Sequence, residues 1–311
     1  MRTVPLGETA VEVSAVCLGC MFFGTRVDAK VSTLVLDRYL EGGGFFLDTA
    51  NNYAFWVEGG RGGESEQLLG RWMFRRGNRE LLFLATKVGA APGEDLSRAA
   101  IHAGIDASLR RLQTDWIDLY YAHVDDRSVP LEETLGAFGE LVAAGKVRQI
   151  GCSNYAAWRL ERARRISDAA GVPRYCCVQQ RHTYLRPRPG ASFGVQLVAD
   201  DGLLDFCRAN PEVALIAYSP LLSGAYTVPG RAIPERYLGP DTDLRLEAVR
   251  RVCRETGASA NQVVLAWLMG TTPSAIPVIS ASNEAQLDEN LGSLAVELSA
   301  EQLATLDNAG A

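Results

Sequence analysis

Residues 82–123 read LFLATKVGAAPGEDLSRAAIHAGIDASLRRLQTDWIDLYYAH, and they indicate the fold more clearly than any other stretch. The stretch begins with a short apolar run that closes on Lys87 and ends with a second one, from Ile117, that closes on His123. Both runs have the length and composition of buried parallel strands. Between them, apolar residues from Leu96 to Leu112 follow the three-and-four spacing of an amphipathic helix. The stretch therefore predicts a strand–helix–strand unit.

The same alternation of strand and helix extends over most of the 311 residues. Further strands are expected at residues 15–18, 45–48, 149–153, 177–180, 214–218 and 276–280. Further helices are expected at residues 32–41, 64–75, 131–144, 156–170, 203–209, 243–269 in two pieces, and 283–292. Eight strands with eight crossovers predict an α/β fold, a (β/α)8 TIM barrel.

The two ends of the sequence predict additions to this barrel. Residues 3–13 have the pattern of a β-hairpin that would precede the barrel and close its bottom. Ser299 precedes Leu303 and Leu306 as a capping residue would, which predicts an extra C-terminal helix. The length fits two average domains or one large barrel. Because no linker rich in Pro, Gly or Ser divides the sequence, we expect residues 1–311 to form a single domain.

Composition narrows the class of protein. The chain has 47% apolar and 22% charged residues and a formal net charge of −6, without a Lys/Arg-rich run, so a nucleic-acid partner is not expected. No stretch approaches the roughly 18 apolar residues of a membrane span, and the N-terminus does not have the pattern of a signal peptide. A cytoplasmic protein without a membrane partner is expected. The sequence does not indicate the oligomeric state.

The seven cysteines are an odd number, scattered without the spacing of a disulfide framework, which predicts reduced thiols. Cys17 and Cys20 form a C-x-x-C motif that could bind metal or carry redox chemistry. The motif stands alone within an apolar run, so we expect it to be structural and expect no metal site.

Polar residues close nearly every predicted strand, and in a TIM barrel the carboxyl ends of the strands meet at the active site. Asp48 and Lys87 would face each other there, and burial predicts that they pair. A purely structural ion pair is the alternative. Tyr53, on the loop after Asp48, can reach the same point, where a nearby ammonium would lower the pKa of its phenol from about 10. His123 could orient a carbonyl oxygen or share the proton with Tyr53.

With these residues in place, the sequence resembles the aldo-keto reductase superfamily, in particular its bacterial NAD(P)H-dependent members, over nearly the whole chain. The matching blocks are FLDTA at 46–50 with Tyr53, GESEQLLG at 63–70, ATKV at 85–88, DWIDLYYAH at 115–123, GKVRQIGCSN at 145–154, AYSPL at 217–221, IPVI at 276–279 and QLDEN at 286–290. The resemblance implies that Tyr53 donates a proton, Lys87 lowers its pKa, Asp48 holds Lys87, and His123 orients the substrate.

The resemblance also implies a nicotinamide cofactor, NADPH by family habit with NADH possible. Ser153, Asn154 and Gln179 would bind its carboxamide, and Tyr218 would stack on its ring. Further contacts are expected at Gly19, Cys20, Met21, Ser219, Pro220, Leu221, Ser223, Gly224, Ile279, Ser280, Ser282, Gln286 and Asn290. The segment at 280–283 lacks the basic side chain that usually grips a 2′-phosphate, although Arg186, Arg188 or Arg231 could reach in from long loops.

The loop after Tyr53, residues 54–63, is longer than the family's usual connection. Phe55 and Trp56 would line a substrate pocket together with Phe22, Phe23 and Tyr184; the alternative is a loop that packs its own aromatic side chains. The long segment at 181–202 would fold over the entrance.

The expected function is reduction of a small-molecule carbonyl, from simple aldehydes and aryl ketones to keto-sugars. Two alternatives use the same residues: oxidation of a sugar or polyol with Tyr53 as base, and a non-catalytic, cofactor-sensing binding subunit. The sequence does not identify the physiological substrate, the direction of the reaction in the cell or the preferred cofactor.

Overall fold

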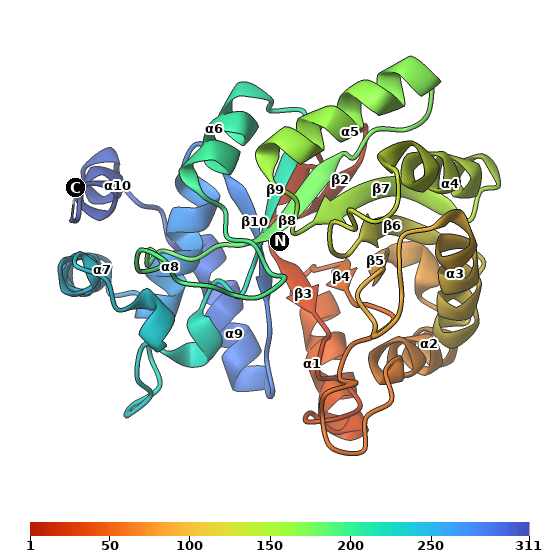
Figure 1. Cartoon of the computed structure of the whole chain (residues 1–311). Helices are drawn as coiled ribbons and strands as arrows, with labels where there is room; N and C mark the ends of the chain where they lie inside the picture. Colours follow the sequence, from red (N-terminus) through yellow and green to blue (C-terminus); the bar gives the residue numbers. More distant parts are fainter. Residues whose placement is uncertain (311) are drawn as a thin grey trace.

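The computed structural model describes residues 1–310 and contains a closed barrel of parallel strands surrounded by helices (Figure 1). The strands follow one another around the barrel in sequence order, and the last, β10, pairs with the first, β3, to close it. The predicted (β/α)8 fold is confirmed, and each predicted strand end lies within two residues of the observed one. The barrel strands are β3 Cys17–Gly19, β4 Phe46–Asp48, β5 Phe83–Val88, β6 Ile117–Ala122, β7 Val147–Ser153, β8 Cys177–Arg181, β9 Ala214–Tyr218 and β10 Ala275–Ile279.

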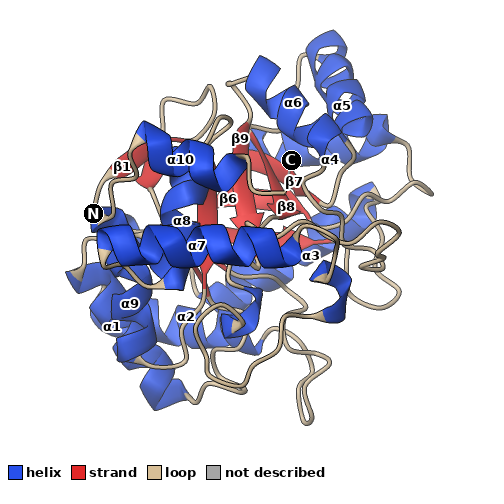
Figure 2. Ribbon diagram, turned by 90° about the vertical axis from the view of Figure 1, so that its left-hand side faces the viewer, coloured by secondary structure: helices blue, strands red, loops and turns tan. Residues whose placement is uncertain are grey.

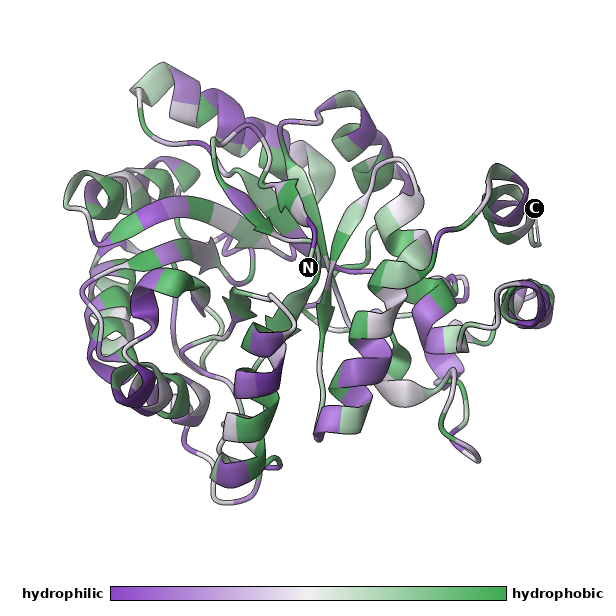
Figure 3. Cartoon of the chain, turned by 180° about the vertical axis from the view of Figure 1, so that it is seen from behind, coloured by the Kyte–Doolittle hydropathy of each residue, from purple (hydrophilic) through white to green (hydrophobic). Residues whose placement is uncertain are grey.

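Helices cover the outside of the barrel (Figures 1 and 2). The helix predicted at 32–41 begins earlier, at Ala29, because the Asp28 carboxylate accepts hydrogen bonds from the backbone N–H groups of Lys30 and Val31. In Figure 3 the helices alternate between hydrophilic and hydrophobic colours, as expected for helices with one face on the barrel. The helices are α1 Ala29–Glu41, α2 Glu64–Arg76, α3 Arg98–Leu112, α4 Leu131–Ala143, α5 Ala157–Ala170, α6 Asp201–Ala209, α7 Thr242–Thr256, α8 Ala260–Gly270, α9 Glu284–Gly292 and α10 Ala300–Asp307.

The predicted N-terminal hairpin is confirmed. Strands β1 (Thr3–Pro5) and β2 (Glu12–Ser14) pair antiparallel. Leu6 and Val13 are fully buried and belong to the same apolar cluster as the inner side chains of the barrel strands. The hairpin therefore closes the end of the barrel opposite the active-site end.

Alternation along the strands divides the barrel interior from its outer layer. Phe83 and Ala85 on β5 and Cys177 on β8 belong to the inner apolar cluster. Since successive side chains point to opposite faces of a strand, Lys87 on β5 and Gln179 on β8 also face the interior, nearer the carboxyl ends. This end of the barrel, called the mouth below, is polar, whereas the opposite end is apolar.

The predicted C-terminal helix is α10. Ser299 accepts a hydrogen bond from the Gln302 N–H and Gln302 returns one to the Ser299 N–H, which forms a capping box. Leu306 is fully buried, and the Trp267 indole N–H donates to the Asp307 carboxylate at 2.7 Å. Helix α10 therefore packs on the outer helices α7 and α8 (Figure 2).

All seven cysteines carry free thiols; six are buried, and Cys253 on α7 is half-buried. Cys17 and Cys20 are both fully buried within the apolar core. Within residues 1–310, no helix is long and apolar enough to span a bilayer, and no group of three His, Cys, Asp or Glu side chains is arranged to hold a metal ion.

Candidate active site

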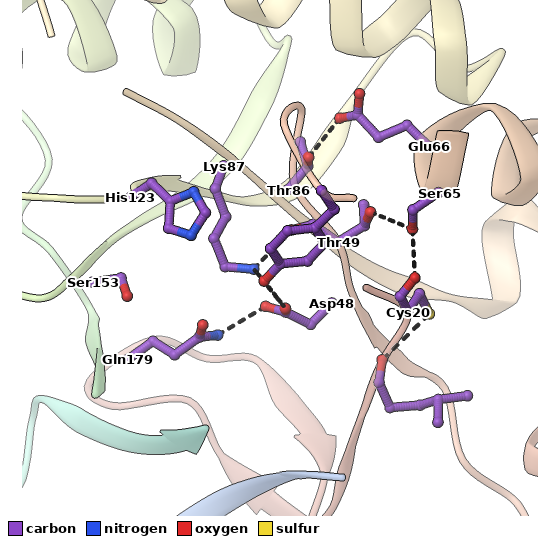
Figure 4. Close-up of polar contacts among 12 residues, drawn as sticks. Cys20, Asp48, Thr49, Ser65, Glu66, Thr86, Lys87, His123, Ser153 and Gln179 are labelled. Atoms are coloured by element: carbon purple, nitrogen blue, oxygen red, sulfur yellow. Dashed lines mark hydrogen bonds and ion pairs between the residues drawn. The ribbon is translucent and has the colours of Figure 1, made fainter. Parts of the chain in front are cut away.

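Lys87 is the centre of the polar cluster at the mouth (Figure 4). Its ammonium donates hydrogen bonds to the Asp48 carboxylate at 2.5 Å, to the Tyr53 hydroxyl at 2.8 Å and to the Thr49 carbonyl at 2.7 Å. Its side chain is fully buried, and that of Asp48 is 2% exposed. The expected ion pair is therefore present, and its cation also contacts the phenol.

Tyr53 reaches this point because its loop is attached to the loop that follows β5. Asn51 donates from its backbone N–H to the Lys87 carbonyl at 3.3 Å and from its side chain to Glu94 at 2.7 Å. The Asn52 side chain donates to the Ala90 carbonyl at 2.9 Å. These contacts bring the Tyr53 hydroxyl to the carboxyl ends of β4 and β5.

The environment of Tyr53 corrects one expectation from the sequence. Burial, followed by the negative charge of Asp48, raises the pKa of the Tyr53 hydroxyl well above its ordinary value. The hydroxyl lies 3.3 Å from Asp48 Oδ1, so the carboxylate offsets the effect of the Lys87 ammonium. In this structure Tyr53 is therefore a neutral phenol, the protonated form that a general acid requires.

His123 lies beside Tyr53, with the two rings edge to face and their centroids 5.8 Å apart. Burial, followed by the positive charge of Lys87, lowers the pKa of His123 well below its ordinary value, so the imidazole is neutral near pH 7. Its Nδ1 atom is buried without a hydrogen-bond partner within residues 1–310. A neutral ring with a free polar atom at the mouth can bind a small polar ligand.

The side chains expected to bind the nicotinamide carboxamide contact other protein groups. Gln179 donates from Nε2 to Asp48 Oδ2 at 2.8 Å. Asn154 donates to the His123 carbonyl at 2.9 Å and to Ser153 Oγ at 3.1 Å, while its Oδ1 accepts from the Tyr218 hydroxyl at 2.8 Å and the Leu197 N–H at 3.0 Å. Protein partners therefore occupy both polar atoms of the Asn154 amide in this structure, and its expected contact with a nicotinamide stays a prediction.

The segments expected to hold the cofactor diphosphate lie at the mouth, after β9 and at the start of α9. The backbone after β9 is left-handed at Ser219, Leu222 and Ser223. The Arg231 guanidinium donates to the Ser223 carbonyl. Ser280, Ser282 and Gln286 are exposed, and Gln286 accepts from the N–H and hydroxyl of Ser282 at 2.9 and 2.8 Å.

One observation tests whether these segments fit a nicotinamide dinucleotide. Asn290 on α9 donates to the Ser280 carbonyl at 3.1 Å, but its own Oδ1 is buried without a partner in the described chain. A buried acceptor without a donor is rare unless a ligand or water supplies one. The residues at this end of the mouth therefore fit a bound polar group.

The other residues expected to contact the cofactor differ in how exposed they are to solvent. Gly19, Cys20, Pro220 and Ile279 are buried, and the Cys20 carbonyl accepts from Ser65 at 2.7 Å (Figure 4). The half-buried residues are Met21, Leu221 and Gly224.

The expected substrate pocket is only partly formed. Phe55 and Trp56 are 38% and 47% exposed and pack edge to face, so the loop does pack its own aromatic side chains while it exposes them at the rim. Phe22 is half-buried under the Arg26 guanidinium. Phe23 is 2% exposed and belongs to the apolar core rather than to a pocket.

The assignment of Tyr184 to the pocket is wrong. Its hydroxyl donates to the Leu306 carbonyl at 2.9 Å, and its ring packs against Trp267 and the Arg245 guanidinium. These partners belong to α7, α8 and α10. Tyr184 therefore fills the layer between the outer helices, away from Asp48, Tyr53, Lys87 and His123, which are called the tetrad below.

Comparison of the sequence with known proteins indicates one family. A family model described as the aldo/keto reductase family matches residues 15–311. The chain belongs to the aldo-keto reductase family. It is similar to norsolorinic acid reductase stcV of Emericella nidulans, with 32% identity over 96% of this chain and 78% of the relative. It is also similar to aldo-keto reductase yakc [NADP(+)] of Schizosaccharomyces pombe, with 30% identity over 92% of this chain and 85% of the relative.

A solved structure with a similar fold belongs to the same family. The crystal structure of the thermostable aldo-keto reductase Tm1743 with the inhibitor epalrestat has a TM-score of 0.80 and 29% identity, and the match covers all of both chains. This aldo-keto reductase is therefore an NAD(P)H-dependent oxidoreductase that acts on carbonyl compounds. The comparisons favour an enzyme over the non-catalytic binding subunit that we considered from the sequence.

Two side chains at the mouth of this aldo-keto reductase were not among the site residues predicted from the sequence. Glu94 accepts hydrogen bonds from Asn51 and from three backbone N–H groups after β5. Arg181 closes β8 two residues after Gln179. Strand alternation could have indicated Arg181, whereas the contacts of Glu94 depend on how two loops meet.

Proposed function

We propose that this aldo-keto reductase reduces an aldehyde or ketone to the alcohol, with Tyr53 as the general acid. The observation that carries the proposal is the Lys87 ammonium, which contacts the Tyr53 hydroxyl and the Asp48 carboxylate at the same time, at 2.8 and 2.5 Å. An ion pair that served only to stabilise the barrel would have no need of a phenol held against its cation.

The proton follows a short path. When bound, a reduced nicotinamide would supply the hydride that the carbonyl carbon accepts. Tyr53 donates its hydroxyl proton to the carbonyl oxygen, which completes the alcohol and leaves a phenolate. The Lys87 ammonium stabilises that phenolate, and a proton from solvent restores the phenol. Proton transfer from a positioned acid typically contributes about 10²–10⁴-fold to the rate.

Asp48 and His123 support this step in different ways. Asp48 keeps Lys87 in place and, with it, forms a nearly neutral pair, so the phenol keeps its proton until the carbonyl accepts it. His123, neutral because of its lowered pKa, orients the carbonyl oxygen through a ring N–H. Neither residue needs to change its charge during reduction.

We further propose NADPH as the preferred cofactor, with NADH as the alternative. The printed name of the yakc relative specifies NADP(+). The proposed contacts are those expected from the sequence, with Ser153, Asn154, Gln179 and Tyr218 at the nicotinamide and the segments around Ser223 and Ser280 at the phosphates. Arg186 and Arg188 pair with Asp241 and Glu235, which leaves Arg231 as the better placed cation for a phosphate.

For the substrate we propose an aromatic carbonyl compound. Phe55 and Trp56 expose ring surface on the loop that carries Tyr53, and flat rings pack well against such side chains. The stcV relative is named for norsolorinic acid. A keto-sugar would make little use of this apolar rim.

The test is the Tyr53→Phe variant, assayed by the loss of NADPH absorbance with 4-nitrobenzaldehyde. We expect kcat to fall by about 10²–10⁴-fold because the general acid is lost. The affinity for NADPH, measured by quenching of tryptophan fluorescence, should stay within a few-fold of wild type. Full activity in the variant would refute the assigned acid, and equal quenching by NADPH and NADH would refute the cofactor preference.

A further inference from the structure

Arg181 is a cation at the mouth that the tetrad does not use. It is the last residue of β8, and strand alternation directs its side chain to the inner face of the barrel, like that of Gln179. It lies opposite Tyr218 in the β8–β9 register. Its guanidinium therefore lies at the mouth, 5.5 Å from the centroid of the Tyr218 ring.

The neighbours of Arg181 do not neutralise its charge. Its guanidinium donates two hydrogen bonds, at 3.2 and 2.7 Å, to the amide oxygen of Gln196, which is uncharged. It lies 5.0 Å from the Phe193 ring centroid and 5.5 Å from that of Tyr218. Across residues 1–310 it forms no ion pair, whereas Arg186 and Arg188 do. A half-buried guanidinium without a carboxylate gains free energy when an anion binds.

The segment above Arg181, residues 190–199, is called the strap below. It is attached to the end of β8, since the Arg181 N–H donates to the Leu197 carbonyl at 3.1 Å and the Ala199 N–H donates to the Arg181 carbonyl at 2.9 Å. Val195 and Leu197 on the strap are 68% and 36% exposed. Phe193, also on the strap, packs against the Arg181 guanidinium, so the strap places an apolar ring beside the cation.

The barrel register gives the separation between Arg181 and the catalytic end. His123 follows β6, and Arg181 ends β8, two strands further round the barrel. Two strand spacings separate the backbones at these two positions by about 10 Å. A substrate that bridges their side chains therefore needs an anionic group and a carbonyl at opposite ends of a small molecule.

We infer that Arg181 determines specificity by binding a carboxylate on the substrate, at the end opposite the carbonyl that Tyr53 protonates. The inference rests on the proposed function and adds a substrate class to it, the aromatic aldehydes and ketones that carry a carboxylate. The guanidinium binds the carboxylate by paired hydrogen bonds, and the strap covers the apolar ring.

The experiment compares 4-carboxybenzaldehyde with its neutral methyl ester, methyl 4-formylbenzoate, in wild type and in the Arg181→Met variant. Wild type should prefer the carboxylate. In Arg181→Met, kcat/KM should fall about 10- to 100-fold more for the carboxylate than for the ester. The Arg181→Lys variant should keep part of the preference, because it keeps the charge but loses the fork of donors.

The control is Arg208→Met, which removes an equal charge from an exposed ion pair on α6 and should keep the wild-type preference. An equal fall for both aldehydes in Arg181→Met would overturn the inference. So would a loss of NADPH affinity as large as the loss of kcat/KM, because the anion would then be a cofactor phosphate.

A binding measurement separates this inference from the proposed function. Titration calorimetry with 4-(hydroxymethyl)benzoate should show tighter binding to wild type than to Arg181→Met, whether or not either aldehyde is reduced. If turnover is absent but this difference remains, the proposed reaction fails and the carboxylate site stands. If the two proteins bind it equally, the carboxylate site fails.

Discussion

At the scale of single residues, the chemistry depends on charges that are buried together. Lys87 is fully buried and contacts Asp48, Tyr53 and the Thr49 carbonyl. Burying either charge alone costs several kcal/mol, whereas the pair and its hydrogen bonds offset much of that cost. The ammonium that we propose assists proton transfer by Tyr53 is therefore also part of what keeps the mouth folded.

The Lys87→Met variant tests the contribution of Lys87 to stability and its contribution to turnover. It leaves the Asp48 carboxylate buried without a cation, so we expect the free energy of unfolding to fall by about 3–5 kcal/mol and turnover to be lost. Urea denaturation and the NADPH assay measure the two effects. The double variant Asp48→Asn/Lys87→Met should recover most of the stability and remain inactive. A stable, active Lys87→Met protein would contradict the role of this pair.

At the scale of elements, two loops meet to position Tyr53, the proposed general acid. Glu94 Oε2 accepts hydrogen bonds from the backbone N–H groups of Gly89, Ala90 and Ala91 at 2.9, 3.2 and 3.1 Å. Its Oε1 accepts from Asn51 at 2.7 Å. One carboxylate thus shapes the loop after β5 and attaches the Tyr53 loop to it. We therefore expect Glu94 to affect the reaction only through the position of Tyr53.

We expect Glu94→Gln to lower kcat about 10-fold with little change in KM. The glutamine amide oxygen is a weaker acceptor than a carboxylate, and the glutamine NH2 group could point at the NH2 group of Asn51, where two donors would meet. The Tyr53 loop should also become easier to digest with protease. The matched control is Glu58→Gln, an exposed residue of the same loop, which should keep wild-type kcat. A parallel rise of KM with no loss of kcat would argue against a positioning role.

The elements also show how much the sequence could predict. Strands and helices could be predicted because apolar periodicity follows from burial. The meeting of Asp48 and Lys87 could be predicted because polar residues close buried strands. The amide contacts of Asn154 and Gln179 could not, since they depend on which neighbours the folded mouth presents. Tyr184 was misplaced because an aromatic residue on a long loop can fill the core as readily as it can line a pocket. The raised pKa of Tyr53 depends on distances that no spacing in the sequence reports.

At the scale of the whole molecule, we expect the stability of the barrel and its outer helices to depend on pH through one buried histidine. His182 follows β8 and packs against Trp267 of the outer layer, with ring centroids 5.8 Å apart. Burial, followed by the positive charge of Arg245, lowers the pKa of His182 to about 4. The folded protein therefore excludes a proton that the unfolded chain takes up below about pH 6.5.

Because the pKa is lower in the folded state, the stability linked to His182 is fully present above about pH 6.5 and is lost as the pH falls toward 4. By linkage the loss amounts to about 3 kcal/mol at pH 4. The His182→Gln variant, which cannot take up this proton, should show a correspondingly smaller decrease in the free energy of unfolding between pH 7 and pH 4.5. Denaturant titrations at several pH values measure it, and identical pH dependence in both proteins would exclude His182 as the cause.

The distribution of thiols has a practical use. Six cysteines are buried and Cys253, on the outer helix α7, is half-buried. A maleimide dye added to the folded enzyme should therefore attach to Cys253 in preference to the other six. Such a dye would accept excitation energy from Trp267 or from a bound reduced nicotinamide. No cysteine would have to be introduced to attach it. Ligand binding could then be followed by optical spectroscopy on the unaltered sequence.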